Sequence, residues 1–391
     1  MPSKILIVDD EPDMELLILQ RFRREIHEGA YTFQFAQQGE EALTAIQSDP
    51  AIEVVLTDIN MPVMDGLTLL ARLNERPNPP ATVIVSAYGD MPNIRAAMNR
   101  GAFDFLTKPL DFQDFEVTIR KTLSQVRRLR DAKADHDRLV ALERDLAIAA
   151  QIQRSFLPHL NGEETHHAAF AVHACMLPAQ AVGGDFYDYF FLDADRLGVV
   201  IGDVSGKGVP AALLMAMTRS LLRASALRGG EPAACLEEVN RLILRDTSSG
   251  RFVTLFYGLL DAQRGTLRYA NAGHSPPFLL HREGPLQQLR QTDLILGAMP
   301  EARYQTREVP LVPGDRLFLY TDGVSEAMNP AQQQFAEERL QQVLGERRIE
   351  GPEELVGRVV EAVRQFTANA PQADDLTALA VLYRGPMGER A

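Results

Sequence analysis

Five polar residues follow or close apolar runs in the first third of this 391-residue sequence. They are Asp9, Asp10, Asp58, Ser86 and Lys108. Three carboxylates in one crevice repel one another unless a divalent cation lies between them. With Mg²⁺ bound, one carboxylate can attack a phosphoryl donor as a nucleophile. A lysine can then neutralise the new phosphate, and a hydroxyl can donate to one of its oxygens.

These side chains need a scaffold that brings strand ends together. Five short apolar runs alternate with helical spacing: Ile5–Val8, Tyr31–Ala36, Val54–Leu56, Val83–Val85 and Phe103–Leu106. This alternation predicts a parallel sheet covered on both faces, with its chemistry at the carboxyl ends of the strands. One such run alone could be a buried helix turn, but the even spacing of five disfavours that reading. Asp10 could also be a helix cap, Asp58 a turn residue and Lys108 a solvated charge, although these ordinary roles would all have to fall on successive strand ends.

A second set of aspartates occurs beside glycines in the remainder of the chain. The four segments are Gly183–Asp188, Gly202–Gly208, Tyr320–Val324 and Ala373–Thr377. Glycines at strand ends let the backbone bend closely, so that carboxylates can converge as hard oxygen ligands. The scarcity of histidines and of paired cysteines disfavours zinc and favours Mg²⁺ or Mn²⁺. Two such ions would activate water and clamp a phosphoryl group for in-line attack, whereas the alternative is ordinary Asp-Gly turn chemistry at all four places.

The segment from about residue 118 to 157 contains no glycine and no proline, which favours a helix. Its apolar residues Leu139, Leu142, Leu146, Ala149 and Phe156 keep a three-four rhythm among many charges. This rhythm predicts a long helix with a coiled-coil-like seam through which a homodimer could form. A solitary solvated linker helix is the alternative, because the seam is poor around residues 130–136.

The rest of the chain carries many short strand patterns and few helical ones. Strands are expected at Phe170–Cys175, Phe186–Leu192, Leu197–Ile201, Phe252–Leu260, Leu267–Asn271, Arg316–Tyr320 and Leu376–Tyr383, and helices at Pro210–Ala226, Pro232–Leu244 and Pro352–Phe366. Such a pattern predicts sheets packed on each other with helices outside. The chain is therefore expected to be multidomain, with units at 1–122 and 159–391 joined by a helical linker at 123–158.

Composition and charge restrict the classes of partner. Hydrophobic residues make up 46% of the chain, charged residues 24%, and the formal net charge is −13. This charge makes nucleic acid and anionic membranes poor partners. No apolar run is long enough to span a bilayer, the start does not resemble a signal peptide, and the two cysteines, Cys175 and Cys235, do not suggest a disulfide framework. A cytoplasmic protein is expected.

Residues 1 to about 122 resemble the receiver domain of bacterial response regulators. The matching stretches are Ile5–Asp10, Asp58–Gly66, Ser86-Ala87 and Lys108-Pro109. The resemblance implies a flavodoxin-like α/β fold with a five-stranded parallel sheet and a cis bond before Pro109. It also implies a sensor histidine kinase or phosphotransfer protein as partner. The implied roles are phosphoacceptor for Asp58, Mg²⁺ ligands for Asp9, Asp10, Asp58 and the Asn60 carbonyl, phosphate contact for Lys108, and switch residues for Ser86 and Phe105.

Residues from about 145 to 383 resemble the metal-dependent PP2C-type serine/threonine phosphatases, in the bacterial subgroup that regulates sporulation and stress sigma factors. The matches are Leu146–Pro158, Gly183–Asp188, Gly202–Met215, Asn271–His274, Tyr320–Ala327 and Asp374–Thr377. The resemblance implies an α+β fold, with a β-sandwich flanked by helices, and two Mn²⁺ or Mg²⁺ ions. The implied ligands are Asp203 as a bridge, the Val204 carbonyl, Asp185, Asp322, and either Asp374 or its neighbour Asp375. The sequence departs from the family at Gln332–Ala336, where glycines and a Phe-Gly pair are usual.

The combined expectation is a response regulator, phosphorylated on Asp58, that controls a phosphatase output. By resemblance to the subgroup, its substrate is a phosphorylated anti-sigma factor antagonist. The alternative is a non-enzymatic adaptor that binds a sigma factor or its regulators through a phosphatase-like domain, but retention of the four acidic segments argues against it. A DNA-binding output would need a basic recognition helix, and none is visible.

Overall fold

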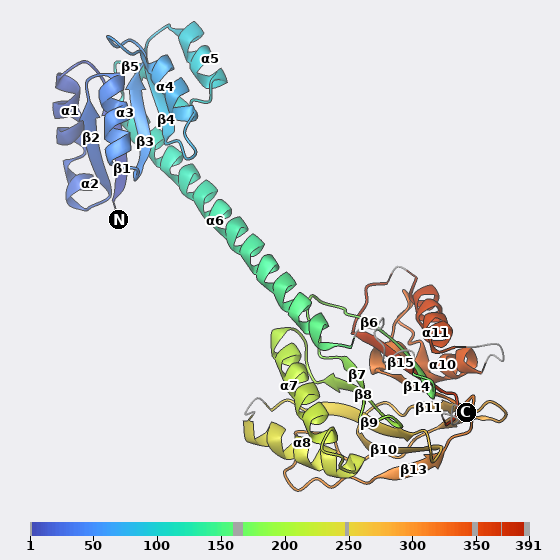
Figure 1. Ribbon diagram of the computed structural model, residues 1–391. Helices are drawn as coiled ribbons and strands as arrows, with labels where there is room; N and C mark the ends of the chain where they lie inside the picture. The colour runs from blue at the N-terminus through green and yellow to red at the C-terminus, as the bar shows by residue number, and fades with distance from the viewer. Residues whose placement is uncertain (1, 159–166, 247–249, 346–350, 369, 387–391) are drawn as a thin grey trace. The chain divides into compact units, whose positions relative to one another are not determined.

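The computed structural model describes residues 2–158, 167–246, 250–345, 351–368 and 370–386 (Figure 1). The chain forms two compact units, Met1–Ala141 and Leu142–Ala391, and the division falls inside one long helix. The domain boundaries expected at residues 122 and 158 stay predictions. Within the described ranges, no helix combines the length and the apolar character needed to cross a membrane.

The N-terminal unit is built on the predicted five-stranded parallel sheet. Its strands are β1 (Ser3–Val8), β2 (Tyr31–Ala36), β3 (Ile52–Asp58), β4 (Ala81–Ala87) and β5 (Asp104–Lys108), in the order β2-β1-β3-β4-β5. Its helices are α1 (Asp13–Arg21), α2 (Arg23–His27), α3 (Gly39–Ser48), α4 (Gly66–Asn74), α5 (Met91–Asn99) and the first turns of α6 (Phe112–Phe156).

Both faces of this sheet are covered, which explains the continuous apolar runs of its strands. Ile5 and Ile7 of β1 pack with Phe115 of α6 on one face. Leu6 and Val8 pack on the other face, against α3 and α4. The alternation within one strand therefore contributes to two separate cores.

Helix α6 is one continuous element of 45 residues, from Phe112 to Phe156. It begins several residues earlier than the rhythm of the sequence indicated. The reason is a cap: the Asp111 carboxylate accepts from the backbone N–H of Gln113 at 2.7 Å and of Asp114 at 3.4 Å. A carboxylate in this position satisfies amides that have no partner within the helix. The helix ends just before Pro158, as expected.

The apolar residues of the predicted seam lie on the surface of the single chain. Leu139 and Leu142 expose more than half of their area (59% and 56%), Phe156 exposes 38%, and Leu146 and Ala149 are half-buried. Exposure of this kind suits either a solvated helix or a helix that pairs with a second copy. The coiled coil stays a prediction.

The C-terminal unit consists of two five-stranded sheets, as the strand patterns predicted. One sheet has the order β13-β10-β9-β8-β7 and the other β12-β11-β14-β15-β6. Its strands are β6 (Phe170–Leu177), β7 (Phe186–Phe191), β8 (Arg196–Val204), β9 (Val253–Asp261), β10 (Thr266–Ala272), β11 (Phe278–Leu280), β12 (Leu286–Gln288), β13 (Arg307–Pro310), β14 (Arg316–Tyr320) and β15 (Leu376–Tyr383). The short strands β11, β12 and β13 were not predicted, because three or four residues carry too little periodicity.

Helices cover the outer faces of the two sheets. They are α7 (Val209–Ala226), α8 (Pro232–Asp246), α9 (Asp322–Ser325), α10 (Ala336–Leu344) and α11 (Pro352–Thr367). Helices α7 and α8 pack over the sheet of β8 and β10, whereas α11 packs over β15 and β6 (Figure 1).

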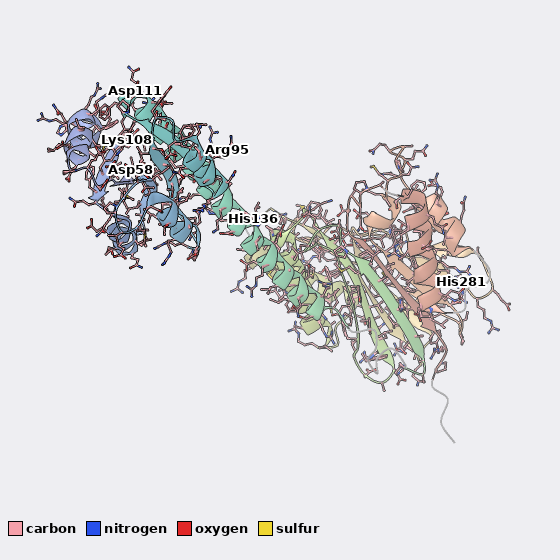
Figure 2. All side chains as sticks on the ribbon, turned by 90° about the horizontal axis from the view of Figure 1, so that it is seen from above. Asp58, Arg95, Lys108, Asp111, His136 and His281 are labelled. Carbon is pink, nitrogen blue, oxygen red and sulfur yellow. The ribbon has the colours of Figure 1, made fainter. Side chains whose placement is uncertain are left out.

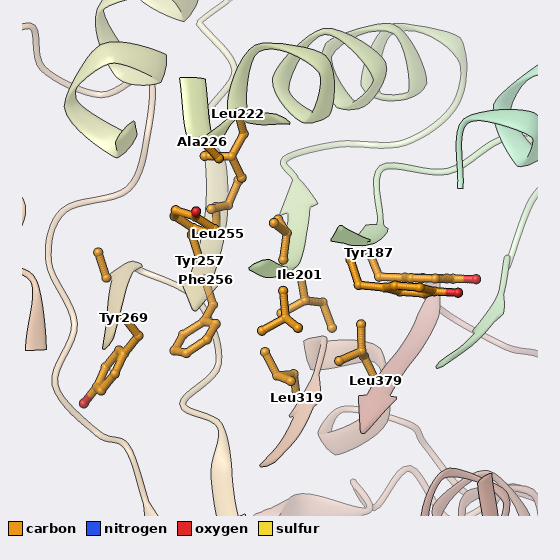
Figure 3. Packing of buried hydrophobic residues seen from close by; sticks show 14 of the residues in the cluster. Tyr187, Ile201, Leu222, Ala226, Leu255, Phe256, Tyr257, Tyr269, Leu319 and Leu379 are labelled. Carbon is orange, nitrogen blue, oxygen red and sulfur yellow. The ribbon is translucent and has the colours of Figure 1, made fainter. Parts of the chain in front are cut away.

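The main core lies between the two sheets. Ile201 of β8 faces Leu319 of β14 and Leu379 of β15, so side chains from both sheets meet in one cluster (Figure 3). All three are fully buried. Burying a side chain of this size is worth about 1.5–3 kcal/mol, so the inter-sheet contact holds the strand ends in place.

The segment that departs from the family pattern forms a strained turn. Gln332 and Ala336 have φ angles of 59° and 65°, in the left-handed region that favours glycine. The Asn329 side chain supports the turn by accepting from the backbone N–H of Ala331 and of Gln333, both at 3.0 Å. The glycines usual in the family are therefore replaced without loss of the turn.

Replacing Ala336 by glycine is expected to raise the free energy of unfolding of the C-terminal unit by about 0.5–1 kcal/mol, because removal of the Cβ relieves a left-handed conformation. Urea denaturation followed by circular dichroism measures this change. Ala331→Gly is the control, since Ala331 lies outside the left-handed region and glycine there only adds freedom to the unfolded chain. Equal destabilisation by both substitutions would contradict the prediction.

Candidate functional site

The three N-terminal aspartates meet at the carboxyl edge of the parallel sheet. Strands β1 and β3 are neighbours, so Asp9 and Asp10, which follow β1, lie beside Asp58 at the end of β3. One carboxylate oxygen from each lies within 4.8 Å of the others. Figure 2 shows Asp58 and Lys108 together in this unit. Such a set of hard oxygen donors suits Mg²⁺.

Lys108 lies directly over these carboxylates. Its Nζ is 2.5 Å from Oδ2 of Asp58, 3.0 Å from Oδ2 of Asp9 and 2.9 Å from Oε1 of Glu11. Burial lowers the pKa of the ammonium, but hydrogen bonds to the three carboxylates outweigh burial and hold that pKa above its usual value. Burial raises the pKa of Asp9. The partnership with Glu11 was not predicted, although Glu11 directly follows the aspartate pair.

Ser86 and Asn60 also lie at the predicted edge, whereas Phe105 is the second residue of β5 and lies toward the other end of that strand. Ser86, fully buried at the end of β4, donates to Oδ2 of Asp90 at 3.3 Å. The Phe105 ring on the adjacent strand is 38% exposed. The backbone N–H of Asn60 donates to Oδ1 of Asp58 at 3.0 Å, which orients the carboxylate. The bond between Lys108 and Pro109 is cis, as expected.

Asp185 is the anchor of the second acidic cluster. It lies just before β7 and is buried, and its Oδ2 accepts from the hydroxyls of Thr321 and Thr377, each at 2.7 Å. These threonines belong to the sheet opposite to that of β7. They were not predicted as site residues, although each lies within three residues of an acid that was. One carboxylate therefore ties the two sheets together at the site.

The acids of this cluster interact unfavourably with one another. Burial raises the pKa of Asp185 well above its usual range, and the charge of Asp203 adds to that effect. Burial likewise raises the pKa of Asp203, with a further contribution from Asp322. Burial also raises the pKa of Asp322. Carboxylates held together in this way need a compensating positive charge, which divalent cations provide.

The structure separates the adjacent candidates Asp374 and Asp375. Asp375 is buried, and its two oxygens accept from the backbone N–H of Ala179 at 2.8 Å and of Gly184 at 3.1 Å. Asp374 is exposed, and its Oδ2 lies 3.1 Å from Nζ of Lys207. Asp375 is thus engaged in holding the glycine loop, while the Asp374 carboxylate stays accessible from solvent.

Glycines keep the cluster open. A Cβ on Gly184 would lie 2.7 Å from the carbonyl oxygen of Val204 and 3.3 Å from Oδ1 of Asp203. A Cβ on Gly183 would overlap the carboxylate of Asp375. Only glycine permits both approaches, so the glycine pair in the sequence reflects steric need.

Gln153, near the end of α6, clamps the same loop. Its Nε2 donates to the carbonyl of Gly183 at 2.7 Å, and its Oε1 accepts from the backbone N–H of Gly183 at 3.2 Å. The side chain is buried. This role of Gln153 was not predicted, because the match of residues 146–158 to the family assigned no contact to it. The last turns of α6 therefore belong structurally to the acidic site.

The donor chemistry of the C-terminal cluster fits hard divalent ions. Carboxylates and the Val204 carbonyl are oxygen ligands, which suit Mg²⁺ or Mn²⁺. Among the described residues, only the N-terminal triad places three acidic ligand atoms within 4.8 Å of one another. The wider spread of the C-terminal acids is compatible with more than one ion.

Two family models match the chain. Residues 5–120 match the response regulator receiver domain, and residues 193–384 match the Stage II sporulation protein E (SpoIIE) family. The chain is a response regulator with a SpoIIE-type phosphatase domain. The receiver domain is 32% identical over 123 residues to sporulation initiation phosphotransferase F of Bacillus subtilis, covering 32% of this chain and 95% of that protein.

The phosphatase domain has relatives of both known sequence and known structure. Phosphoserine phosphatase RsbU of Bacillus subtilis is 28% identical over 224 residues, which are 57% of this chain and 65% of RsbU. The solved SiaA-PP2C domain of Pseudomonas aeruginosa superposes with a TM-score of 0.55 at 26% identity, covering 63% of this chain and 98% of that domain. The chain spans about half the length of the curated relatives that it matches with this domain (41%, 65% and 45%).

Proposed function

We propose that this response regulator is phosphorylated on Asp58 and thereby controls a metal-dependent protein serine/threonine phosphatase. The observation that carries the phosphatase assignment is the convergence of aspartates from four distant segments on the rims of two sheets. Repulsion among these carboxylates does not stabilise the fold. If cations bind between them, however, the same carboxylates can serve catalysis.

The residues that would hold two Mn²⁺ or Mg²⁺ ions are Asp185, Asp203, the Val204 carbonyl, Asp322 and Asp374. When bound, such ions would supply an activated water and neutralise the charge of the phosphoryl group. Asp375 and Gln153 act indirectly, because they fix the glycine loop before Asp185. Thr321 and Thr377 keep the Asp185 carboxylate in one orientation.

The proposed reaction is hydrolysis of a phosphate monoester. The oxygen of water forms a bond to phosphorus while the bond between phosphorus and the serine or threonine oxygen breaks. The attacking water loses a proton, the departing serine or threonine oxygen gains one to become a hydroxyl, and inorganic phosphate leaves. No residue of the chain is covalently modified in this step, so the phosphatase site needs no nucleophilic side chain.

The receiver domain would accept a phosphoryl group from a sensor histidine kinase or a phosphotransfer protein. The bond from the donor histidine nitrogen to phosphorus breaks as one from Asp58 oxygen to phosphorus forms. Asp9, Asp10, Asp58 and the Asn60 carbonyl would hold Mg²⁺. Lys108, now 2.5 Å from Asp58, is placed to contact the phosphate, and Ser86 and Phe105 would change conformation as switch residues.

The proposed substrate is a phosphorylated anti-sigma factor antagonist. This assignment is supported by similarity to RsbU, which is a phosphoserine phosphatase. Helix α6 would relay the state of the receiver domain, and pairing of its exposed apolar seam in a homodimer is one way to do so.

The full chain is expected to hydrolyse p-nitrophenyl phosphate with Mn²⁺ or Mg²⁺ and to lose that activity when EDTA removes the metal. Release of p-nitrophenol measures the rate, and isothermal titration with Mn²⁺ measures binding. Activity restored by adding Mn²⁺ back controls for damage by the chelator. Absence of both hydrolysis and Mn²⁺ binding to the phosphatase domain would instead indicate a non-enzymatic adaptor.

A further inference from the structure

A cavity of about 440 Å³ adjoins the acidic cluster of the phosphatase domain. Asp374 and Lys207 form part of its wall, and so does Gly323, which directly follows Asp322. A phosphoryl group held by these acids would therefore lie at the edge of the cavity. Its volume is within the range of about 300–1,000 Å³ found for ligand pockets.

Most of the other walls of the cavity are apolar. Leu177 ends strand β6 and Pro178 follows it. Met328 follows α9, and Val363 and Thr367 come from the last turns of α11. Met328 exposes 36% of its area, so part of this apolar wall is open to solvent. An apolar surface beside a charged catalytic cluster suits a ligand that carries both a phosphate and an apolar group.

One further basic residue lies on the cavity. Arg364 of α11 is exposed and lines it, together with Lys207 near the acids. Two acids, Glu326 and Asp374, line the cavity as well, and Lys207 pairs with Asp374 at 3.1 Å. Arg364 therefore supplies a positive charge on the side of the cavity formed by α11, and this charge complements the negative charge of a phosphorylated segment.

We infer that this cavity is the subsite that receives an apolar side chain flanking the phosphoserine of the protein substrate. The inference rests on the proposed phosphatase function. It adds that residues of α11 and of the loop after α9 determine which phosphoproteins the enzyme selects as substrates. The walls at Met328 and Val363 contact the apolar side chain, and the exposed Arg364 offers a positive charge to the phosphorylated segment. The subsite would discriminate between substrates that share the same phosphate.

The test uses the full chain with Mn²⁺ and a set of synthetic phosphoserine peptides. The peptides differ at a single residue, leucine or aspartate, placed in turn at each of the three positions on either side of the phosphoserine. Phosphate release gives kcat/KM for each peptide. At one position or more, the wild-type chain is expected to favour leucine by about tenfold or more, mainly through KM.

Two variants change the cavity in different ways. Thr367→Trp fills it, and Met328→Asp places a charge on its apolar wall. Both are expected to reduce the leucine-to-aspartate ratio to about one. Gln365→Trp is the matched control, because Gln365 is an exposed neighbour on α11 outside the cavity lining, and it is expected to keep the wild-type ratio.

A wild-type chain that shows no leucine preference at any position would overturn the inference, and so would a preference that persists in both cavity variants. Hydrolysis of p-nitrophenyl phosphate by the wild type separates the two levels of the proposal. If that compound is hydrolysed but the peptides are not discriminated, only the subsite is wrong. If neither is hydrolysed, the proposed phosphatase function fails and the subsite with it.

Discussion

Replacing Asp203 by alanine is expected to lower Mn²⁺-dependent hydrolysis of p-nitrophenyl phosphate by about three orders of magnitude, which corresponds to roughly 4 kcal/mol of transition-state stabilisation. Asp203 lies between the other acids: its pKa is raised by burial and by the charges of Asp322 and Asp374. The position therefore experiences the field of the whole cluster, and the substitution would remove the proposed bridging ligand. Initial rates at saturating Mn²⁺ measure the effect.

Asp195→Ala is a suitable control for this experiment. Asp195 is adjacent to the start of β8, at the end of that strand opposite to Asp203, and its carboxylate accepts from the side chain of Gln263 on the surface. Its removal is expected to leave hydrolysis within about twofold, since surface polar substitutions are usually worth less than ~0.5 kcal/mol. Activity of Asp203→Ala equal to that of the control would remove the two-ion assignment.

Replacing Asp58 by asparagine is expected to abolish the response of the phosphatase to acetyl phosphate or to a fluoroberyllate mimic. In the wild type, either reagent should change turnover by about fivefold or more, or change the oligomeric state, because coupling between sites is typically worth ~1–3 kcal/mol. An amide at residue 58 cannot accept the phosphoryl group and lacks the charge that Lys108 now contacts at 2.5 Å. Turnover and sedimentation, each with and without the reagent, measure the response.

The control is Asp49→Asn, at the end of α3 and near the beginning of β1, so it lies at the end of the strands opposite to Asp58. The Asp49 carboxylate pairs with Lys4 at 2.6 Å and accepts from the side chain of Gln34, and neither partner belongs to the proposed site. This variant should respond as the wild type does. If Asp58→Asn still responded fully, control would have to operate without the receiver domain.

Much of the fold could be predicted from the sequence, because many strands are apolar runs and several of these runs are followed by an acidic residue. The parallel sheet, the two packed sheets and the positions of α7, α8 and α11 were predicted in this way and are confirmed. The early start of α6 was missed, since a single capping residue, Asp111, sets it. Short edge strands such as β11 have no periodicity to detect.

The polar contacts that orient the site were harder to predict than the acids themselves. Asp185 could be recognised beside its glycines, but the hydroxyls of Thr321 and Thr377 reach it across 136 and 192 residues of sequence. The sequence does not show which of two adjacent aspartates is exposed to solvent. The fold was needed to show that Asp374 is exposed and Asp375 is buried. The clamp by Gln153 depends on how α6 meets a loop, which no local pattern encodes.

The contact of Asp185 with hydroxyls from the opposite sheet has a consequence for the lifetime of the protein. Because one carboxylate would contact both the ions and the opposite sheet, ion binding would be coupled to the stability of the two packed sheets. Ions that bind only the folded state stabilise it by RT ln(1 + [L]/Kd). Starvation for divalent metal would then lower the abundance of this regulator through proteolysis as well as its turnover. If the proposed ions bind at Asp185, a cell short of divalent metal would lose the regulator protein as well as its phosphatase activity.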